Sequence, residues 1–192
     1  MKVLIACEYT GAVRDAFRAR GHDAWSCDLE PSDSPYHLQE DVRGYLGDDW
    51  DLMIAHPPCT HLAVSGARWF KDKQLEQREA LDFVRELMDA PIPRICIENP
   101  VSVISSAIRK PDQIIHPYHF GDPHSKATCL WLTGLEPLVH TEVVEPTWHY
   151  FESGKRWPEW YYHTGNLKGE ERRRARDKTF PGIARAMAEQ WG

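Results

Sequence analysis

Short apolar runs alternate with helical patterns over the first two thirds of the chain, and this alternation constrains the fold more than any other feature. Residues 3–6, 23–28 and 51–55 are predicted strands, and residues 95–97 form another strand that ends before Asn99-Pro100. Strand, helix and strand repeated in this order predict an α/β domain built on a parallel sheet.

The helices, and two further strands, are read from the spacing of apolar residues. Residues 13–20 and 74–88 place apolar side chains at helical spacing, and 181–191 is predicted as a closing helix. Residues 128–132 and the stretch near 113–120 are predicted strands. In parallel α/β sheets ligands bind at the carboxyl ends of the strands, so the residues directly after each strand are candidates for a site. These candidates are 7–11, 28–30, 56–60 and 98–100.

The composition of the 192 residues is that of one soluble globular domain. No apolar run approaches the ~20 residues of a membrane helix, and the start turns acidic too soon for a secretory signal. Five scattered cysteines without a CxxC pair give no disulfide framework. We therefore expect reduced thiols, a cytoplasmic location and no membrane contact. A net charge of −6 argues against a dedicated DNA binder with a basic face, although it leaves room for a local basic patch.

The most specific candidate site is the stretch 56–60, His-Pro-Pro-Cys-Thr, which directly follows a predicted strand. Two prolines stiffen this exit and remove two backbone donors, which makes a rigid mount for a nucleophile. A nucleophilic thiol at Cys59 requires a lowered pKa, which a neighbouring His or Arg would supply. A lone cysteine beside a turn is more often inert, but one placed directly after Pro-Pro at a strand end favours catalysis.

Acidic residues follow two other strands. Glu98 comes at the edge of a buried strand, where desolvation raises a carboxyl pKa and prepares a proton donor; the alternative is a cap on the next helix. Asp28 and Glu30 follow the second strand, where an acid commonly accepts hydrogen bonds from a ribose, or else stays a solvated loop acid. Asp41 and Asp51 taken alone are read as caps or surface charges.

Two further readings of the strand exits are weaker. Residues 7–11 hold a single glycine and make a poor phosphate cradle. His56, Cys59 and His61 are close in sequence, but their spacing lacks the paired ligands of a structural zinc site. No metal is predicted.

Beyond about Glu145 the chain becomes rich in aromatic and basic residues. Trp, Tyr and Phe crowd 148–162, and the charged run 170–176 follows. Aromatic side chains can stack on bases, and arginines can contact phosphates. The alternative is a small aromatic subcore with a solvated charged helix.

Taken in order, these residues resemble the DNA cytosine-5 methyltransferases along nearly the whole chain. The most specific elements are Pro57-Pro58-Cys59, similar to the family's catalytic loop, and Ile97-Glu98-Asn99-Pro100, similar to its Glu-Asn-Val motif. The resemblance implies a Rossmann-like S-adenosylmethionine-dependent methyltransferase sheet with helices on both faces and a small, irregular, aromatic-rich insert. Weaker matches are a first cofactor motif at 3–17, a ribose-binding acid at Asp28, an adenine-contacting acid at Asp41-Val42-Arg43, a site-lining motif at 120–128 and a closing motif at 179–186.

The resemblance also implies a reaction, with S-adenosylmethionine as the cofactor and duplex or single-stranded DNA as the substrate. Cys59 would add to carbon 6 of a cytosine, Glu98 would hold the exocyclic amine and protonate ring nitrogen 3, and Lys126 is the third predicted catalytic residue. The methyl group goes to carbon 5, and in duplex DNA the base first leaves the stack. The predicted cofactor-binding residues are Cys7, Glu8, Tyr9, Thr10, Gly11, Asp28, Leu29, Asp41, Val42 and Pro57. The predicted substrate-binding residues are Pro58, Ser65, Asn99, His124 and Thr128.

Several positions depart from the family pattern. Glu8 stands where the first motif often has glycine, and Pro100 replaces the usual valine. His124, Lys126 and Thr128 stand in place of a Gln and two Arg, so one positive charge is lost.

The family's target-recognition region is nearly absent. We predict a single methyltransferase-like domain over 1–192, with 135–178 as a reduced recognition insert, 179–192 as a closing helix and a loop over 60–74 that closes over the site. Such a minimal form suits a compact phage or mobile-element genome, which would place it in the host cytoplasm, and a protein partner could supply further recognition. Other substrates stay open, namely tRNA or a free cytosine nucleotide, as does a catalytically silent relative that binds nucleic acid or protein. The sequence sets no oligomeric state.

Overall fold

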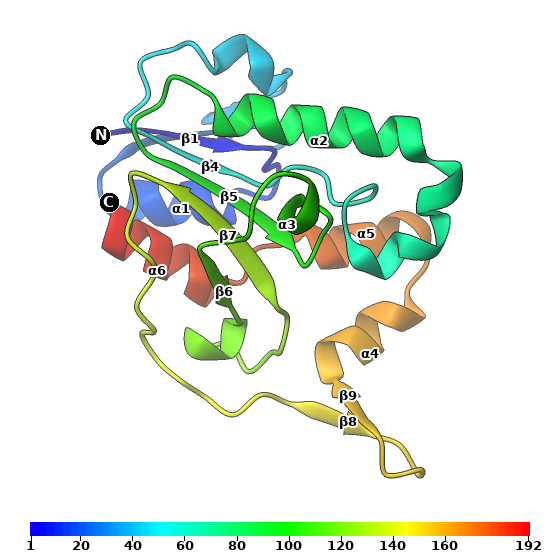
Figure 1. The fold of residues 1–192 in the computed structure, drawn as a ribbon. Helices are drawn as coiled ribbons and strands as arrows, with labels where there is room; N and C mark the ends of the chain where they lie inside the picture. Colours follow the sequence, from blue (N-terminus) through cyan, green and yellow to red (C-terminus); the bar gives the residue numbers. More distant parts are fainter.

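A seven-stranded sheet forms the centre of the computed structural model, which describes the backbone of residues 1–192 and every side chain except those of Arg68 and Trp69 (Figure 1). The strand order is β3-β2-β1-β4-β5-β7-β6. The strands are β1 (Lys2–Ala6), β2 (Asp23–Cys27), β3 (His37–Leu38), β4 (Leu52–Ala55), β5 (Ile95–Pro100), β6 (Gln113–Ile115) and β7 (Thr128–Thr133). The helices are α1 (Ala12–Ala19), α2 (Gln74–Met88), α3 (Ile104–Ala107), α4 (Glu159–Asn166), α5 (Gly169–Asp177) and α6 (Pro181–Trp191), with 3-10 helices η1 (Val42–Tyr45), η2 (Val64–Asp72) and η3 (Pro117–His119).

Helices cover both faces of the sheet, as the sequence predicted. Figure 1 shows α2 along one face, and α1 and α6 together on the other. Val3 and Ile5 of β1 belong to the core under α1 and α6, whereas Leu4 and Ala6 belong to the core under α2. An unbroken apolar run is therefore what a central strand buried on both faces requires.

Strand β7 runs antiparallel to both of its neighbours in the sheet, β5 and β6. The prediction of a parallel sheet is therefore correct for β1 to β5 but wrong for β7. Parallel neighbours need a crossover connection, usually an α-helix. Residues 116–127, which link β6 to β7, contain only the short η3 in their described backbone, so the chain turns back on itself.

Two predicted strands have different ends in the structure. β5 does not stop before Asn99-Pro100 but continues through Glu98, Asn99 and Pro100, because β7 pairs along its whole length. Pro100 takes the final position, where a missing backbone donor is tolerated. The strand predicted near 113–120 ends at Ile115, and η3 begins at Pro117.

The aromatic segment is more ordered than the predicted irregular insert. It forms a two-stranded hairpin of β8 (Trp148–Tyr150) and β9 (Arg156–Pro158), followed by α4 and α5. Gly154, with a φ of 78°, supplies the left-handed conformation in the hairpin turn. In Figure 1 the hairpin extends away from the sheet at the bottom of the view. Within the described chain, no helix combines the length and the apolar character needed to cross a lipid bilayer.

Candidate active site

A cavity of about 290 Å³ lies at the carboxyl ends of the parallel strands. The exits of β1, β2 and β4 and the end of β5 all contribute to its wall, which is where an α/β sheet positions a ligand. Twelve residues proposed from the sequence line this cavity. They are Cys7, Glu8, Tyr9, Thr10, Asp28, Leu29, Pro57, Pro58, Cys59, Glu98, Asn99 and Lys126.

The exit of β1 turns sharply and directs an acid to the start of α1. Cys7 has a φ of 59°, a left-handed conformation that is uncommon outside glycine and frequent at functional sites. The Glu8 carboxylate that follows accepts hydrogen bonds from the backbone N–H groups of Val13 at 2.7 Å and Arg14 at 3.2 Å. Glu8 is 4% exposed, and burial raises its pKa. This residue, in a position where the family often has glycine, therefore caps the first turn of α1 as well as lining the cavity.

The Pro-Pro-Cys loop is held by β5. The side-chain amide of Asn99 donates a hydrogen bond to the Pro57 carbonyl at 2.8 Å, and the Cys59 carbonyl accepts from the backbone N–H groups of Leu62 and Ala63. These hydrogen bonds hold the loop from both sides, and the rigidity that its prolines suggest stays a prediction. Burial and the nearby charges of Asp177 and Glu98 raise the pKa of the Cys59 thiol, which Lys126 only partly offsets. The expected low pKa of the Cys59 thiol is thus wrong for this form of the protein, because burial, and after it the acids Asp177 and Glu98, outweigh Lys126.

Glu98 is paired with a histidine. The Nδ1 atom of His56 lies 3.0 Å from Oε2 of Glu98, and both side chains are largely buried. Burial acts to raise the pKa of Glu98, but the hydrogen bond and charge of His56, together with Lys126, reverse that effect and lower it. The predicted raised pKa of Glu98 is therefore wrong, because the sequence does not reveal that these two residues meet.

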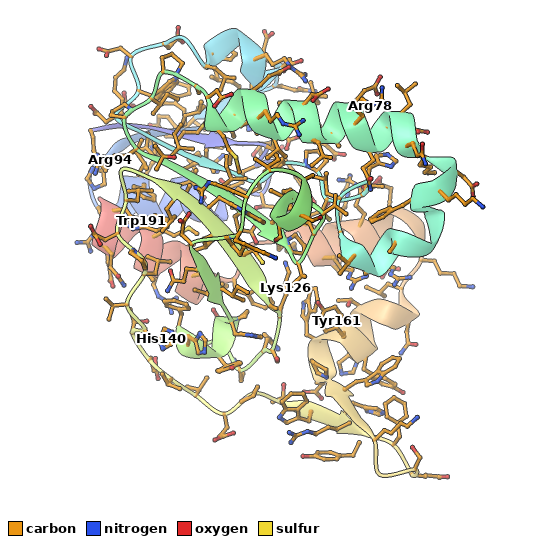
Figure 2. The ribbon with its side chains drawn as sticks, in the orientation of Figure 1. Arg78, Arg94, Lys126, His140, Tyr161 and Trp191 are labelled. Carbon is orange, nitrogen blue, oxygen red and sulfur yellow. The ribbon has the colours of Figure 1, made fainter. Side chains whose placement is uncertain are left out.

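Lys126 connects the cavity to the aromatic segment. Its Nζ donates a hydrogen bond to the Arg176 carbonyl at 3.3 Å and lies 5.3 Å from the Trp160 ring centroid. Figure 2 shows Lys126 between β7 and α4, with Tyr161 of α4 below it in the view. The predicted recognition insert is thus joined to the cavity wall through Lys126.

Helix α5 contributes cavity residues that were not singled out from the sequence. Arg173, Arg176 and Asp177 all line the cavity. Arg173 forms an ion pair with Glu30 after β2, and its guanidinium lies 5.9 Å from the Tyr9 ring centroid. The charged run 170–176 was the available signal, but charges at all but one position give no periodicity that shows which residues face the cavity. His56, Thr60, Pro100 and Thr179 complete the lining together with Glu30.

Three predicted cofactor-binding residues lie outside the lining. Gly11, with a φ of 78°, precedes α1, and a side chain there would meet Arg14. Asp41 caps η1 by accepting a hydrogen bond from the Arg43 backbone at 3.0 Å, as the cap reading of this residue suggested. Val42 is buried in the core under α2. Their contact with a cofactor stays a prediction.

Three predicted substrate-binding residues also lie outside it. Ser65 is exposed in η2, His124 packs on Phe180 with ring centroids 5.2 Å apart, and Thr128 is buried in β7 opposite Pro100. The loop predicted to close over the site holds η2, and the side chain of Arg68 in it lies outside the described residues. Among the described residues, no group of three or more His, Cys, Asp or Glu is arranged to hold a metal ion.

Several buried polar atoms in the cavity wall have no partner among the described side chains. They are the Tyr9 hydroxyl, Nε2 of His56 and Oδ1 of Asn99. Buried polar groups are rarely left without a hydrogen-bond partner, and where they are, a bound water or ligand is a frequent reason. The site thus combines a thiol, an acid–imidazole pair and free hydrogen-bonding groups, a set that suits group transfer to a polar substrate.

No family model matches the chain, and no curated protein matches it. Among solved structures it is similar to a candidate DNA modification methyltransferase encoded within a prophage, from E. coli, with a TM-score of 0.52 and 15% identity. That match covers 76% of this chain and 52% of the other, so the chain spans about half the length of that protein. The 16S rRNA methylase RmtB, at a TM-score of 0.35 and 14% identity over 68% of this chain and 54% of its own, is too distant to carry an argument. The chain therefore has a methyltransferase-like α/β fold with a mostly parallel seven-stranded sheet.

Proposed function

We propose that this protein transfers a methyl group from S-adenosylmethionine to carbon 5 of a cytosine in DNA, with Cys59 as the nucleophile. One observation carries the proposal: Cys59 and Glu98 line the same cavity at the ends of the adjacent strands β4 and β5. The resemblance of both motifs to the cytosine-5 methyltransferases and the methyltransferase-like fold support it independently.

The residues of the cavity fit this cofactor. A cationic sulfonium is favoured by surrounding carboxylates, and a donor without phosphate needs no glycine-rich cradle at the exit of β1. The unpaired Tyr9 hydroxyl would hydrogen-bond a bound molecule, and Asp28 and Leu29 would hold its nucleoside part. The cofactor supplies the methyl group when bound. The carboxylates that line the cavity are Glu8, Asp28, Glu30, Glu98 and Asp177.

The roles of the protein groups follow from their positions. The Cys59 thiolate adds to carbon 6 of the cytosine, and the electron pair displaced from the ring reaches nitrogen 3, which is protonated from the Glu98 side. The Lys126 ammonium near Glu98 helps to lower the pKa of that carboxyl, whereas burial acts to raise it. Carbon 5 becomes nucleophilic and accepts the methyl group, and loss of its proton then expels the Cys59 thiolate.

The charge distribution supports a nucleic-acid substrate. Residues 148–178 hold eight Lys and Arg against five Asp and Glu, a net charge of +3 in a chain whose total is −6. Tyr150 and Trp157 of the hairpin are 65% and 55% exposed. Exposed aromatic rings beside basic side chains are suited to stacking on bases and contacting phosphates. The reduced insert is therefore the part of the chain proposed to hold DNA.

A silent nucleic-acid-binding relative is the second candidate, and one observation favours it. Burial and neighbouring acids raise the pKa of Cys59, so the free protein holds this residue as a thiol. For catalysis, substrate binding must lower the pKa of the Cys59 thiol, for example by moving Asp177 away from it. A silent binder does not need a thiolate at Cys59.

The test is transfer of labelled methyl from S-adenosylmethionine to unmethylated duplex DNA, single-stranded DNA, tRNA and cytosine nucleotides. We expect 5-methylcytosine in DNA with wild type, and none with Cys59→Ala or Cys59→Ser. Cys27→Ser is a matched control, because Cys27 lies outside the cavity lining and its thiol donates to the Glu40 carbonyl, as a serine hydroxyl can. Binding of the cofactor without label on any substrate would point to a missing protein partner, and absence of both label and cofactor binding would favour the silent candidate. Label on another atom would refute the cytosine-5 reaction.

A further inference from the structure

His56 and Glu98 form a buried pair in the cavity wall that the Pro-Pro-Cys and Glu-Asn motifs do not account for. The side chains of His56 and Glu98 are 11% and 15% exposed, and their nearest polar atoms are 3.0 Å apart. Two backbone facts set this position. His56 follows β4, whose last residue Ala55 pairs with Ile97 of β5, and the His56 backbone N–H donates to the Ala6 carbonyl. The sheet register therefore places the imidazole beside Glu98.

Charged groups from two other parts of the fold face this pair. Glu8 lies at the exit of β1, Lys126 precedes β7, and both line the cavity with His56 and Glu98. Burial acts to lower the pKa of His56, but Glu98 and then Glu8 outweigh burial and Lys126, and the pKa is raised. The pKa of Glu98 is lowered in return. In the free protein the pair is thus an imidazolium donating a hydrogen bond to a carboxylate.

An ionised Glu98 cannot by itself protonate a base. Ring nitrogen 3 of cytosine has a lone pair, and a bare carboxylate opposite it would be repelled. A proton must therefore come from another group, and the described part of the cavity wall offers one directly hydrogen-bonded to Glu98, at Nδ1 of His56.

We propose that His56 is the proton-holding partner of Glu98, so that the acid acting on nitrogen 3 of the substrate base is the His56–Glu98 pair. This inference rests on the proposed function. His56 acts through Glu98 and is a positioning residue, while Glu98 contacts the substrate.

The proton transfer balances within the site. The Nδ1–H bond of His56 breaks, its electron pair stays on the ring, and its proton passes to the Glu98 carboxylate. As sulfur bonds to carbon 6, the displaced electron pair reaches nitrogen 3 and forms an N–H bond with this proton, and the electron pair of the broken O–H bond stays on Glu98. His56 ends neutral and Glu98 ends in its starting charge state. When sulfur later leaves carbon 6, nitrogen 3 returns its proton by the same route, and the imidazolium is restored.

The first experiment measures the pair without reference to activity. The ring nitrogens of His56 are followed by NMR in the full-length protein as the pH is raised, in wild type and in Glu98→Gln. We expect the wild-type ring to remain an imidazolium above about pH 6.5, and the Glu98→Gln ring to lose its proton at a lower pH, since burial then acts without the opposing carboxylate. A wild-type ring that is neutral at neutral pH would overturn the inference.

The second experiment measures methyl transfer to unmethylated DNA against pH, with His56→Gln and His56→Asn beside wild type. Both variants keep a neutral donor for Glu98 but hold no mobile proton. We expect kcat to fall about 10- to 100-fold with the KM for S-adenosylmethionine unchanged. The alkaline limb of the profile should move to lower pH, because Glu98 alone holds a proton less strongly than the pair. His140→Gln is the control, since this exposed histidine lies away from Lys126 and the cavity (Figure 2).

The outcomes separate this inference from the proposed function. If the wild type is active and the folded His56 variants show the same pH–rate profile, or an alkaline limb moved to higher pH, the proton-holding role of His56 is refuted and the proposed function stands. A wild type that methylates nothing would remove the proposed function, and with it the step described here. If neither variant folds, the NMR titration of wild type decides.

Discussion

Replacing Gly182 by alanine should weaken the docking of α6 strongly, because this glycine touches another backbone segment. A Cβ at Gly182 would overlap the Phe120 carbonyl oxygen and would lie 2.7 Å from Oδ2 of Asp122. Real Cβ atoms essentially never approach another heavy atom closer than 3.0 Å. The same Asp122 oxygen accepts a hydrogen bond from the Gly182 backbone N–H at 2.7 Å. No rotamer change can relieve contact with a backbone oxygen, so α6 must shift and lose that bond.

The magnitude follows from three contributions. Overpacking costs about 1–3 kcal/mol, and loss of a hydrogen bond to a charged acceptor costs about 1.5–3 kcal/mol. Alanine returns about 1 kcal/mol through its higher helix propensity. The free energy of unfolding should therefore fall by about 1.5–5 kcal/mol, and in a domain of this size the melting temperature should fall by roughly 3–20 °C.

The assay is thermal and urea unfolding followed by circular dichroism. Gly165→Ala in α4 is the matched control, since a Cβ there has nothing within 4 Å. We expect it to be neutral or to stabilise by no more than about 1 kcal/mol. If Gly182→Ala stays within about 0.5 kcal/mol of this control, the close approach of α6 to residues 120–122 is refuted, and with it the positioning of Thr179 in the cavity.

Two further predictions concern the insert and the outer strand. Trp157→Ala should weaken binding of fluorescently labelled single-stranded DNA by about 5- to 150-fold, because one stacked base is lost, and should leave S-adenosylmethionine binding unchanged. Tyr36→Ala is the control, since Tyr36 is an exposed aromatic residue outside the insert. Equal weakening in both variants would contradict the assignment of DNA binding to the insert. Asp112→Asn should destabilise the protein at neutral pH. Partial burial acts to raise the pKa of Asp112, but hydrogen bonds from the Leu132 N–H and Arg109 outweigh burial and lower this pKa. The ionised Asp112 therefore stabilises the fold above about pH 3.9, and this stabilisation is lost as the pH falls through the lowered pKa of Asp112. Urea unfolding should show the variant and wild type converging in strong acid, and a constant difference would contradict this.

The sequence by itself determined the elements whose pattern is local. Residues 3–6 and 52–55 are apolar at every position, which only a strand buried on both faces requires. Helices α2 and α6 have the predicted bounds because their apolar spacing repeats over three turns or more. It also predicted that the candidate site lies at the strand exits, and residues of these exits line the cavity. Cys59 and Glu98 were assigned from their places after strands, and the parallel sheet brings strand ends to one edge.

Tertiary structure decided the features that depend on which distant residues meet. The direction of β7 depends on the absence of a crossover helix in the described link before it, and the length of β5 depends on its pairing with β7. The charge states of the site changed for the same reason: His56 reverses the effect of burial on Glu98, and Asp177 of α5 adds to the burial that raises the pKa of Cys59. A pKa is set by neighbours within a few ångströms, and no local pattern in the sequence states which neighbours those are.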